Sequence, residues 1–481
     1  MTKPSLSIAL VAYIIAAPSL ARAEPFKLTP QVVVSGALIS GKDRLIKEAQ
    51  FRKAELPVFQ ALGVFDPVFT GIGEYQIDRA DALSGISNEE DKYLKWGFGF
   101  KKKFRTGSTL NVDYLRNQRK SVFGSTTFLA TSSQAYLDQI QFSVKQELSG
   151  NFFGIVDRAL LSAEQARYEA ASLEYEENIE KIALESLDLF WKAYIAKESL
   201  KESLDARTTL ERLVKTIEKK RRFGFADLGD LSRSKAELKI QNQNVKKNSQ
   251  AYLSSIDLVF EAMHQDVPDE ISFEVSSELP PPPEEKFPET VDGLRRIQIS
   301  REALDAASIE RDAAQFSSLP EVALKGSATY VGVEEDPGSS VSEMLGWTKP
   351  IYVVGLELKF ALDSDTIRAG RVAREIGYDE SLAQYSKTRK HLVNEIQNNY
   401  RNVTSTYQIA LEALEVVSLR EKVVKSQEQS YRQGRIDLSV LIQDYNSYFH
   451  ANTQRATAFG NYHIALNQYA ATVDQLRTVK K

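Results

Sequence analysis

The spacing of apolar residues in the second half of the chain has the period of a long, packed helix. Apolar residues alternate three and four positions apart at Val393, Ile396, Tyr400, Val403, Tyr407, Ala410, Leu414 and Val417. A less regular seam in the first half comprises Ala183, Leu187, Phe190 and Tyr194. No glycine or proline interrupts residues 155–223 or 378–433. Each half therefore predicts one long helix, about 100 Å long in the first half at 1.5 Å per residue, that packs lengthwise against other helices.

Both expected helices end at a similar short motif, RRFGFADLGDL in the first half and YRQGRIDLSVL in the second. Gly224 and Gly434 occupy equivalent places and fit the left-handed residue that closes a helix. Asp227 and Asp437 follow three residues later and fit the N-cap of a second helix, whose first free N–H groups a carboxylate accepts. The motif predicts a helix–turn–helix corner in each half. The sequence thus contains an internal repeat, and we expect both corners at the same end of the molecule.

Upstream of each long helix the apolar period changes to two, which is typical of β-strands. LKWGFGFKKKF, DQIQFSVKQEL and YVVGLELKFAL alternate apolar residues with glycine or polar residues, and residues 110–114 continue the pattern. Weaker alternation opens each strand region, at residues 69–77 and 322–330. Such strands fit either an antiparallel sheet over a soluble core or a transmembrane barrel with a polar lumen.

The long coiled helices and an exported N-terminus favour the barrel. In that interpretation Gln141, Glu357 and Lys359 line the lumen. The lipid-facing side chains are then Trp96, Phe98, Phe100, Phe142, Val144, Leu356, Leu358 and Phe360.

The first 23 residues have the pattern of a secretory signal peptide. Lys3 precedes an apolar stretch from Ile8 to Ala17, and small residues follow at Ala21 and Ala23. A short membrane anchor is the alternative, but the apolar run is too short to span a bilayer. No later stretch approaches the roughly 18 apolar residues of a transmembrane helix. We therefore expect an exported protein that is periplasmic, secreted or held in a membrane by strands.

Composition and motifs point away from catalysis. The 481-residue chain has no cysteine, which excludes disulfides and thiol chemistry, and its net charge is −4. We find no concentrated basic block, so nothing points to nucleic acid. His264, His391, His450 and His463 show no zinc-binding spacing, and no nucleophile elbow or phosphate-binding glycine loop is present. We predict no catalytic residue, metal site or cofactor, and interpret the chain as a passive conduit.

The prolines mark the expected domain boundaries. Pro67 and Pro320 each end a helical segment and introduce a strand region, and Pro280–Pro283 lie in an extended linker. The first strand region has an extra hairpin, near residues 94–114. The expected division is a signal peptide at 1–23, a first repeat at 24–266 (strands about 67–148, long helices about 155–266), a proline-rich linker at 267–290 and a second repeat at 291–481 (strands about 320–362, long helices about 366–475).

The chain resembles the TolC-like outer-membrane efflux protein family in the order of its elements. That order is helix, proline, strand hairpin, long helix, glycine corner and return helix, and it occurs twice after a signal peptide. GVFDPVFTGIGEY and QELSGNFFG are similar to the family's segments at the first strand and at the start of the first long helix. The resemblance covers residues 30–475. It implies a mainly α fold with a membrane β-barrel, in which a homotrimer closes one barrel in the outer membrane and one α-helical barrel across the periplasm.

The resemblance also implies partners and a location. Family members are exit ducts of tripartite efflux or type I secretion systems, in contact with outer-membrane lipid. A periplasmic adaptor (membrane fusion protein) and an inner-membrane pump complete the system, and nucleic acid plays no part. An elongated periplasmic coiled-coil adaptor or scaffold is the alternative. It would not need two clusters of amphipathic strands. An exported enzyme is a distant third possibility.

Two features depart from the family pattern. Family barrels usually take four strands from each chain, whereas six candidates occur here, so the extra hairpin either widens the barrel or lies outside it. Family members also often narrow the tip with acidic residues, and Asp230 matches one such position. In the second corner Val440 and Gln443 occupy the matching positions, with Asp437 and Asp444 nearby. The tip and gate candidates are therefore Gly224, Asp227, Asp230, Gly434, Asp437, Gln443 and Asp444, although Asp227 and Asp437 are also explained as helix caps.

Overall fold

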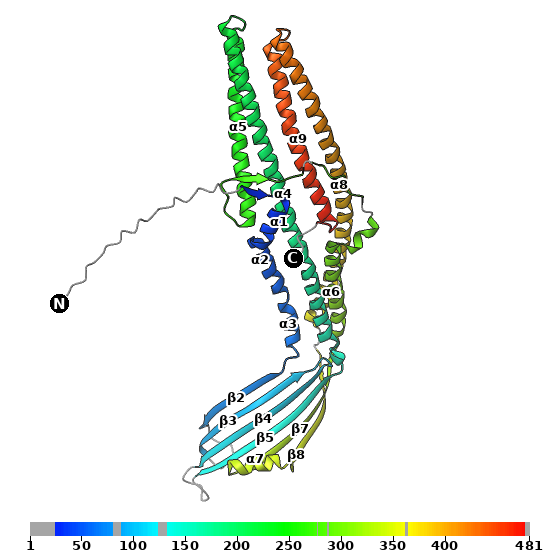
Figure 1. Cartoon of the computed structure of the whole chain (residues 1–481). Coiled ribbons are helices and arrows are strands. Elements are labelled where there is room, and N and C mark those ends of the chain that lie inside the picture. Colours follow the sequence, from blue (N-terminus) through cyan, green and yellow to red (C-terminus); the bar gives the residue numbers. More distant parts are fainter. Residues whose placement is uncertain are drawn as a thin grey trace, which may run out of the picture.

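Two long helical hairpins project from one end of the molecule and a β-sheet lies at the other end (Figure 1). The computed structural model describes residues 25–79, 88–123, 132–276, 278–285, 288–360 and 364–476. The signal peptide predicted at residues 1–23 lies outside these residues. Within the described ranges, none of the helices combines the length and apolar composition that a bilayer-spanning helix requires.

The hairpins are the long helices predicted from the seams. The first consists of α4 (Ile155–Arg222) and α5 (Leu228–Met263), and the second of α8 (Asp365–Arg432) and α9 (Leu438–Thr472). Both corners lie at the end of the molecule far from the sheet, as expected (Figure 1). Shorter helices flank α4 and α8 nearer the sheet: α1 (Pro30–Ile39), α2 (Lys42–Ala54), α3 (Leu56–Gly63) and α6 (Arg295–Ser317).

The predicted seam on α8 is buried for most of its length. Ile396, Val403 and Ala410 lie in an apolar core with Tyr462 and residues of α6 and α9, and the intervening seam residues pack against it. Near the end of the seam, Leu414 is 45% exposed in the single chain. Packing within the chain resumes farther along α8, where Val424 is buried near the corner.

Six antiparallel strands form the sheet, in the order β2-β3-β4-β5-β7-β8. Pro67 and Pro320 stand directly before strands, as predicted. The strands are β2 (Val68–Asp78), β3 (Asn88–Lys103), β4 (Ser108–Phe123), β5 (Ser132–Glu147), β7 (Glu321–Glu334) and β8 (Pro350–Lys359). The sheet is open in the described chain, with β2 and β8 at its edges. The closed barrel expected from the sequence is therefore not made by one chain, because its two edge strands do not pair with each other.

Several elements were not predicted. β1 (Phe26–Leu28) pairs in parallel with β6 (Ile271–Phe273), which lies inside the expected linker. The linker is also held against α9, where the Tyr462 hydroxyl donates to the Pro280 carbonyl oxygen at 2.6 Å. Between β7 and β8, α7 (Pro337–Leu345) packs on the sheet. Two 3₁₀ turns precede helices: η1 (Phe152–Gly154) comes before α4, and η2 (Pro288–Gly293) comes before α6.

Candidate functional site: the helical corners and the two-faced sheet

The two corners have the same backbone geometry. Gly224 and Gly434 adopt left-handed φ angles of 78° and 73°. In the first corner the N–H groups of Gly224 and Phe225 donate to the Arg221 and Lys220 carbonyls at 3.0 and 2.8 Å. The equivalent hydrogen bonds in the second corner, from Gly434 and Arg435, measure 3.1 and 2.9 Å. Both corners are therefore Schellman motifs with glycine at C′, as the repeated sequence motif predicted.

The corners differ in how the return helix begins. Asp227 is the N-cap of α5, and its carboxylate accepts the N–H of Asp230 at 2.6 Å. Asp437 occupies the same place before α9, but its side chain makes no capping hydrogen bond. The prediction that Asp437 accepts the first N–H groups is therefore wrong. At this corner the Val440 N–H bonds to the backbone carbonyl of Asp437 at 3.2 Å, and Leu438 is buried.

The first corner displays apolar and cationic side chains to solvent. Phe223 and Phe225 are 75% and 81% exposed. The last turn of α4 carries Lys219, Lys220, Arg221 and Arg222 in succession, which complements the negative end of the helix dipole. This basic run was not predicted as part of the site. Two phenylalanines that flank a glycine, directly after four cations, are the signal that could have identified an exposed docking surface.

The two hairpins hold each other near the corners. Ile217 of α4, Leu231 of α5, Val424 of α8 and Leu441 of α9 lie in one apolar cluster, to which Ala226 and Ile436 of the corners are packed. Across the hairpins, the Lys220 ammonium lies 4.0 Å from the centre of the Tyr431 ring and 3.5 Å from its carbonyl oxygen. These contacts keep the two hairpins together at their far end.

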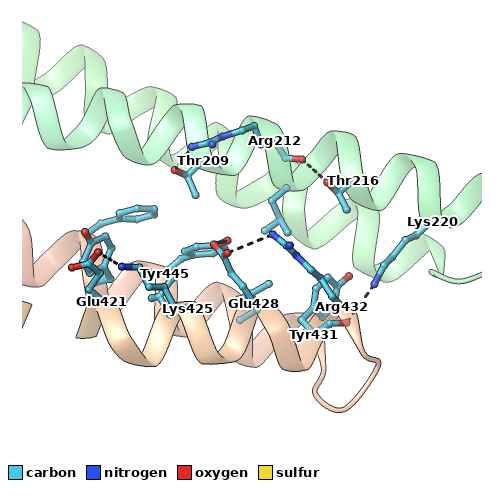
Figure 2. Close-up of a pocket in the computed structure, with 15 residues that line it drawn as sticks. Thr209, Arg212, Thr216, Lys220, Glu421, Lys425, Glu428, Tyr431, Arg432 and Tyr445 are labelled. Atoms are coloured by element: carbon cyan, nitrogen blue, oxygen red, sulfur yellow. Dashed lines mark hydrogen bonds and ion pairs between the residues drawn. The ribbon is translucent and has the colours of Figure 1, made fainter. Parts of the chain in front are cut away.

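A groove of about 510 Å³ opens between the hairpins beside these contacts (Figure 2). Its charged lining residues are Arg212 and Lys220 from α4 and Glu421, Lys425, Glu428 and Arg432 from α8, so that cations outnumber carboxylates. The Tyr445 hydroxyl donates to Glu428 at 2.6 Å, and burial together with this hydrogen bond raises the pKa of Tyr445. Lys425 pairs with Glu421 at 2.6 Å. The groove is open to solvent and lined by charged and apolar side chains, so it is not a closed ligand cavity.

The acidic gate candidates do not gather within one chain. Asp230 is half-buried and faces the second hairpin. The pKa of Tyr431 in that hairpin is raised mainly by burial and, to a smaller extent, by the negative charge of Asp230. Asp444 is half-buried on α9, one residue before Tyr445, and Gln443 is exposed beside it. A ring of carboxylates would need further copies of the chain, so the gate remains a prediction.

The sheet has one apolar and one polar face, as the alternation predicted. Residues directly opposite in the register share a face, and Phe69, Phe100, Val112, Phe142 and Ala328 form one such row. Rows like this place the predicted lipid-facing residues of the strands together on this face: Trp96, Phe98, Phe100, Phe142, Val144, Leu356 and Leu358. Phe360 follows β8 directly and is exposed. Contact with lipid itself remains a prediction.

The opposite face carries charge and is crowded, as on the inner side of a curved sheet. Glu357 of β8 pairs with Lys325 at 2.8 Å and with Lys145 at 3.3 Å, which links three strands. A Cβ atom at Gly99 would come within 2.5 Å of Thr70 Oγ1 and 2.7 Å of Asp113 Oδ1. Glycine there lets neighbouring strands approach closely on the polar side, which is common where a sheet bends.

Three carboxylates near the middle of the helical part have the spacing of a cation site. Glu177, Glu180 and Asp474 lie together, but Arg295 sits among them. Its guanidinium is an ion-pair partner of Glu180, and lies 3.4 Å from Glu177 and 3.3 Å from Asp474. Burial raises the pKa of Glu177. The arginine already supplies the positive charge that a metal would bring, so this cluster is explained as a structural ion pair.

Comparison with known proteins gives a likeness in structure alone. No protein-family model matches the sequence, and no curated protein matches it either. The CmeC outer-membrane channel of Campylobacter jejuni superimposes with a TM-score of 0.69 at 13% identity, over 99% of this chain and 96% of that one. VceC, an outer-membrane protein of Vibrio cholerae, gives 0.69 at 12% identity over 93% and 97%.

A third structure, the open state of the MtrE outer-membrane channel of Neisseria gonorrhoeae, gives a TM-score of 0.67 at 12% identity, over 93% and 90% of the two chains. These likenesses span nearly the whole chain, strands and helices together. They confirm the expected mainly α fold with its sheet, but not the closure of a barrel or a trimer. The chain has the fold of TolC-like outer-membrane channels.

Proposed function

We propose that the chain is one subunit of an outer-membrane exit duct, which conducts solute passively across the periplasm and the outer membrane in a tripartite efflux or type I secretion system. The observation that carries this proposal is the two-faced sheet at one end of a chain whose other end is a pair of long hairpins. An apolar face suits lipid and a polar, crowded face suits a water-filled lumen.

An exposed apolar stripe on α8 supports assembly into a homotrimer. Ile409, Val416, Leu419 and Val423 recur at helical spacing on α8, and each is more than a third exposed. Leu414, near the end of the predicted seam, is exposed as well. A stripe of this kind on a long helix is normally covered by a neighbouring helix. A second copy of the chain supplies that helix in the proposed assembly.

The corners are the proposed docking end for a periplasmic adaptor and, through it, an inner-membrane pump. Exposed Phe223 and Phe225 offer apolar anchors beside the cations of α4. Opening of the duct requires the hairpins to separate at the contact between Lys220 and Tyr431 and at the apolar cluster beneath it. Asp230 and Asp444, repeated around the trimer, would attract cations at this narrow end within a Debye length of about 8–10 Å.

Labelling adjacent residues of β5 tests the duct. Gln141 lies on the polar face and Phe142 on the apolar face, and the natural chain has no cysteine. In outer-membrane vesicles the Gln141→Cys thiol should react quickly with a water-soluble maleimide. The Phe142→Cys thiol should react slowly, and a fluorophore there should be quenched by nitroxide lipids. Equal labelling and no lipid quenching would instead favour the periplasmic scaffold.

Tethering the corners tests the gate. Ala226→Cys and Ile436→Cys place one thiol on each corner, and a flexible cleavable cross-linker between them should abolish export until it is cut. A matched pair within the first hairpin, Glu218→Cys and Lys235→Cys, replaces an ion pair of 2.9 Å and should leave export unchanged. Normal export through tethered corners would overturn the gating proposal.

A further inference from the structure

The extra hairpin of the first half, β3 and β4, lies inside the sheet. β3 pairs with β2 from Val68–Lys101 to Asp78–Asp91, and with β4 along nearly its whole length. β4 in turn pairs with β5 from Ser108–Gln146 to Val122–Ser132. Both sides of the hairpin are thus bonded to the sheet strands β2 and β5. A hairpin outside the sheet would instead leave β2 and β5 free to pair with each other.

The turn between β3 and β4 is fastened to the start of α4. Arg158 of α4 donates from Nη1 to the Arg105 carbonyl at 2.9 Å. Lys103 at the end of β3 pairs with Asp157 at 2.6 Å. Gly107 and Gly154 approach so closely that a side chain on either would overlap the other segment's backbone. The hairpin is therefore built into the junction between the sheet and the helices.

The alternation of the other strands continues through the hairpin. Trp96, Phe98 and Tyr114 lie on the apolar face, whereas Gly99 and Asp113 lie on the polar face. The inner strands thus show the same two surfaces as β5 and β8. They have the character of a wall segment with lipid on one side and water on the other.

The sheet ends in two edges that fit one another. Among the described strands, none pairs with the outer edge of β2 or of β8. An unpaired strand edge in a bilayer leaves N–H and C=O groups without hydrogen-bond partners, which is strongly unfavourable. β2 leads away from the helical part after α3, and β8 leads back to it before α8. The two edge strands therefore run in opposite directions, and β8 of one copy can pair with β2 of another copy as an antiparallel neighbour. Such pairing also keeps the apolar face continuous.

We infer that the β8 edge of each copy pairs with the β2 edge of the next, so that three copies with six strands each close a barrel of eighteen strands. This inference rests on the proposed trimeric duct. Barrel diameter grows roughly linearly with strand number, so this barrel is wider by roughly half than one with the four strands per chain usual in the family. Barrels of 16–18 strands enclose an aqueous channel. The outer-membrane section is then a wide exit, and the helical part sets the size of solute that passes.

Cross-linking between the edges tests the closure. Thr70→Cys on the polar face of β2 is combined in turn with cysteine at each polar-face position of β8, namely Ile351, Val353, Gly355, Glu357 and Lys359. Oxidation should convert at least one of these variants into a covalently closed trimer on a denaturing gel. The control replaces Thr70→Cys by Asp113→Cys on the inner strand β4, which should give no interchain product with any partner.

Two outcomes would overturn the inference. A disulfide within single chains would mean that each sheet closes on itself, and the absence of any product would mean that the edges do not meet. If the Gln141→Cys and Phe142→Cys labelling pattern persists in either case, the duct stands and only the eighteen-stranded wall fails.

Removal of the hairpin tests the width. A variant that lacks residues 79–131 and joins Asp78 to Ser132 by a short turn keeps β2 and β5 antiparallel. The largest polyethylene glycol that enters from the barrel side should shrink in radius by roughly one third, as expected for twelve strands in place of eighteen. The radius of the largest polyethylene glycol that enters from the helical side should not change. An unchanged barrel-side limit would contradict the inference, and if the variant fails to insert, the edge cross-links decide alone.

Discussion

The two halves of the chain match in their helices and differ in their strands. α4 and α8 are both 68 residues long, and α5 and α9 have 36 and 35 residues. The first half nevertheless contributes four strands of the sheet and the second half two. Helix lengths must agree because both corners share one apolar cluster at the far end. An antiparallel hairpin carries no such constraint, since it adds two strands and returns the chain to the side from which it left.

The corners repeat this contrast on a smaller scale. Their Schellman hydrogen bonds are the same, but a side chain caps α5 whereas a backbone carbonyl and a buried leucine start α9. The two corners thus share their backbone geometry but differ in the side-chain contacts that start the return helix. Substitutions at equivalent places should separate the two.

The largest effect is expected where strands of the two halves meet under α7. Asp138 of β5 is fully buried and accepts hydrogen bonds from Arg116 at 2.8 and 2.9 Å and from Tyr114 at 2.6 Å. Asp138→Ala leaves the arginine without its charge partner and should lower the free energy of unfolding by about 3–5 kcal/mol. Denaturant unfolding in lipid vesicles measures this loss. Glu321→Ala, which breaks an exposed pair with Lys359, is the control and should change little.

A smaller, pH-dependent effect is expected where helices of the two halves meet. His463 of α9 stacks on Trp191 of α4 with ring centres 4.0 Å apart. Burial lowers the pKa of His463 from 6.5 to about 4. Between pH 6.5 and pH 4 the His463 side chain is therefore protonated in the unfolded chain but neutral in the folded chain. The contribution of neutral His463 to the free energy of unfolding is full above about pH 6.5 and declines as the pH falls towards 4.

The loss over that window should reach at most about 3 kcal/mol. It is measured as the difference in free energy of unfolding between pH 7 and pH 4. His463→Phe should remove this part of the pH dependence while keeping the ring contact, and exposed His450→Phe should not. A wild-type slope in His463→Phe would contradict this explanation.

The corner glycines should respond equally. Gly224→Ala and Gly434→Ala each place a Cβ in the left-handed region, where neither site has a neighbouring atom to clash with. Each should weaken its corner by roughly 1–2 kcal/mol through backbone strain alone. Amide hydrogen exchange at the start of α5 and α9 reports the opening. Gly370→Ala, inside α8, should instead stabilise that helix slightly. Unequal losses of stability at the two corners would mean that they are not equivalent.

The smallest effect should distinguish the halves. Asp227→Ala removes a capping hydrogen bond and should loosen the first turn of α5 by about 1 kcal/mol. Asp437→Ala removes no such bond and should leave α9 almost unchanged. The same exchange measurement compares them, and equal losses would mean that Asp437 caps α9 in solution after all.

Local patterns predicted much of this fold. Glycine-free runs indicated the long helices, although α8 begins at Asp365, before the run does. Gly224 and Gly434 marked the corners, and alternation around Phe98 and Phe142 identified the faces of the sheet. These features depend on neighbours within a few residues, so a sequence carries them directly. The two-strand pairing of β1 with β6 was missed because three-residue strands have no period to detect.

Other features depend on contacts between distant segments. Asp437 has the sequence of a cap, yet the start of α9 is fixed by packing from the other hairpin. Leu414 continues the apolar seam, yet it is 45% exposed among the described residues of its own chain. The candidate gate residues Asp230, Gln443 and Asp444 belong to this class, because a constriction is a property of the assembly.

We propose that this chain builds a continuous conduit whose narrow point lies at the corners. The direct measurement is single-channel conductance of the detergent-extracted protein in a planar bilayer, with Asp230→Ala recorded beside it. We expect discrete conductance steps for both proteins and a larger step for the variant. Silence from both, with the helices and the sheet intact, would contradict the conduit and leave the periplasmic scaffold as the better explanation.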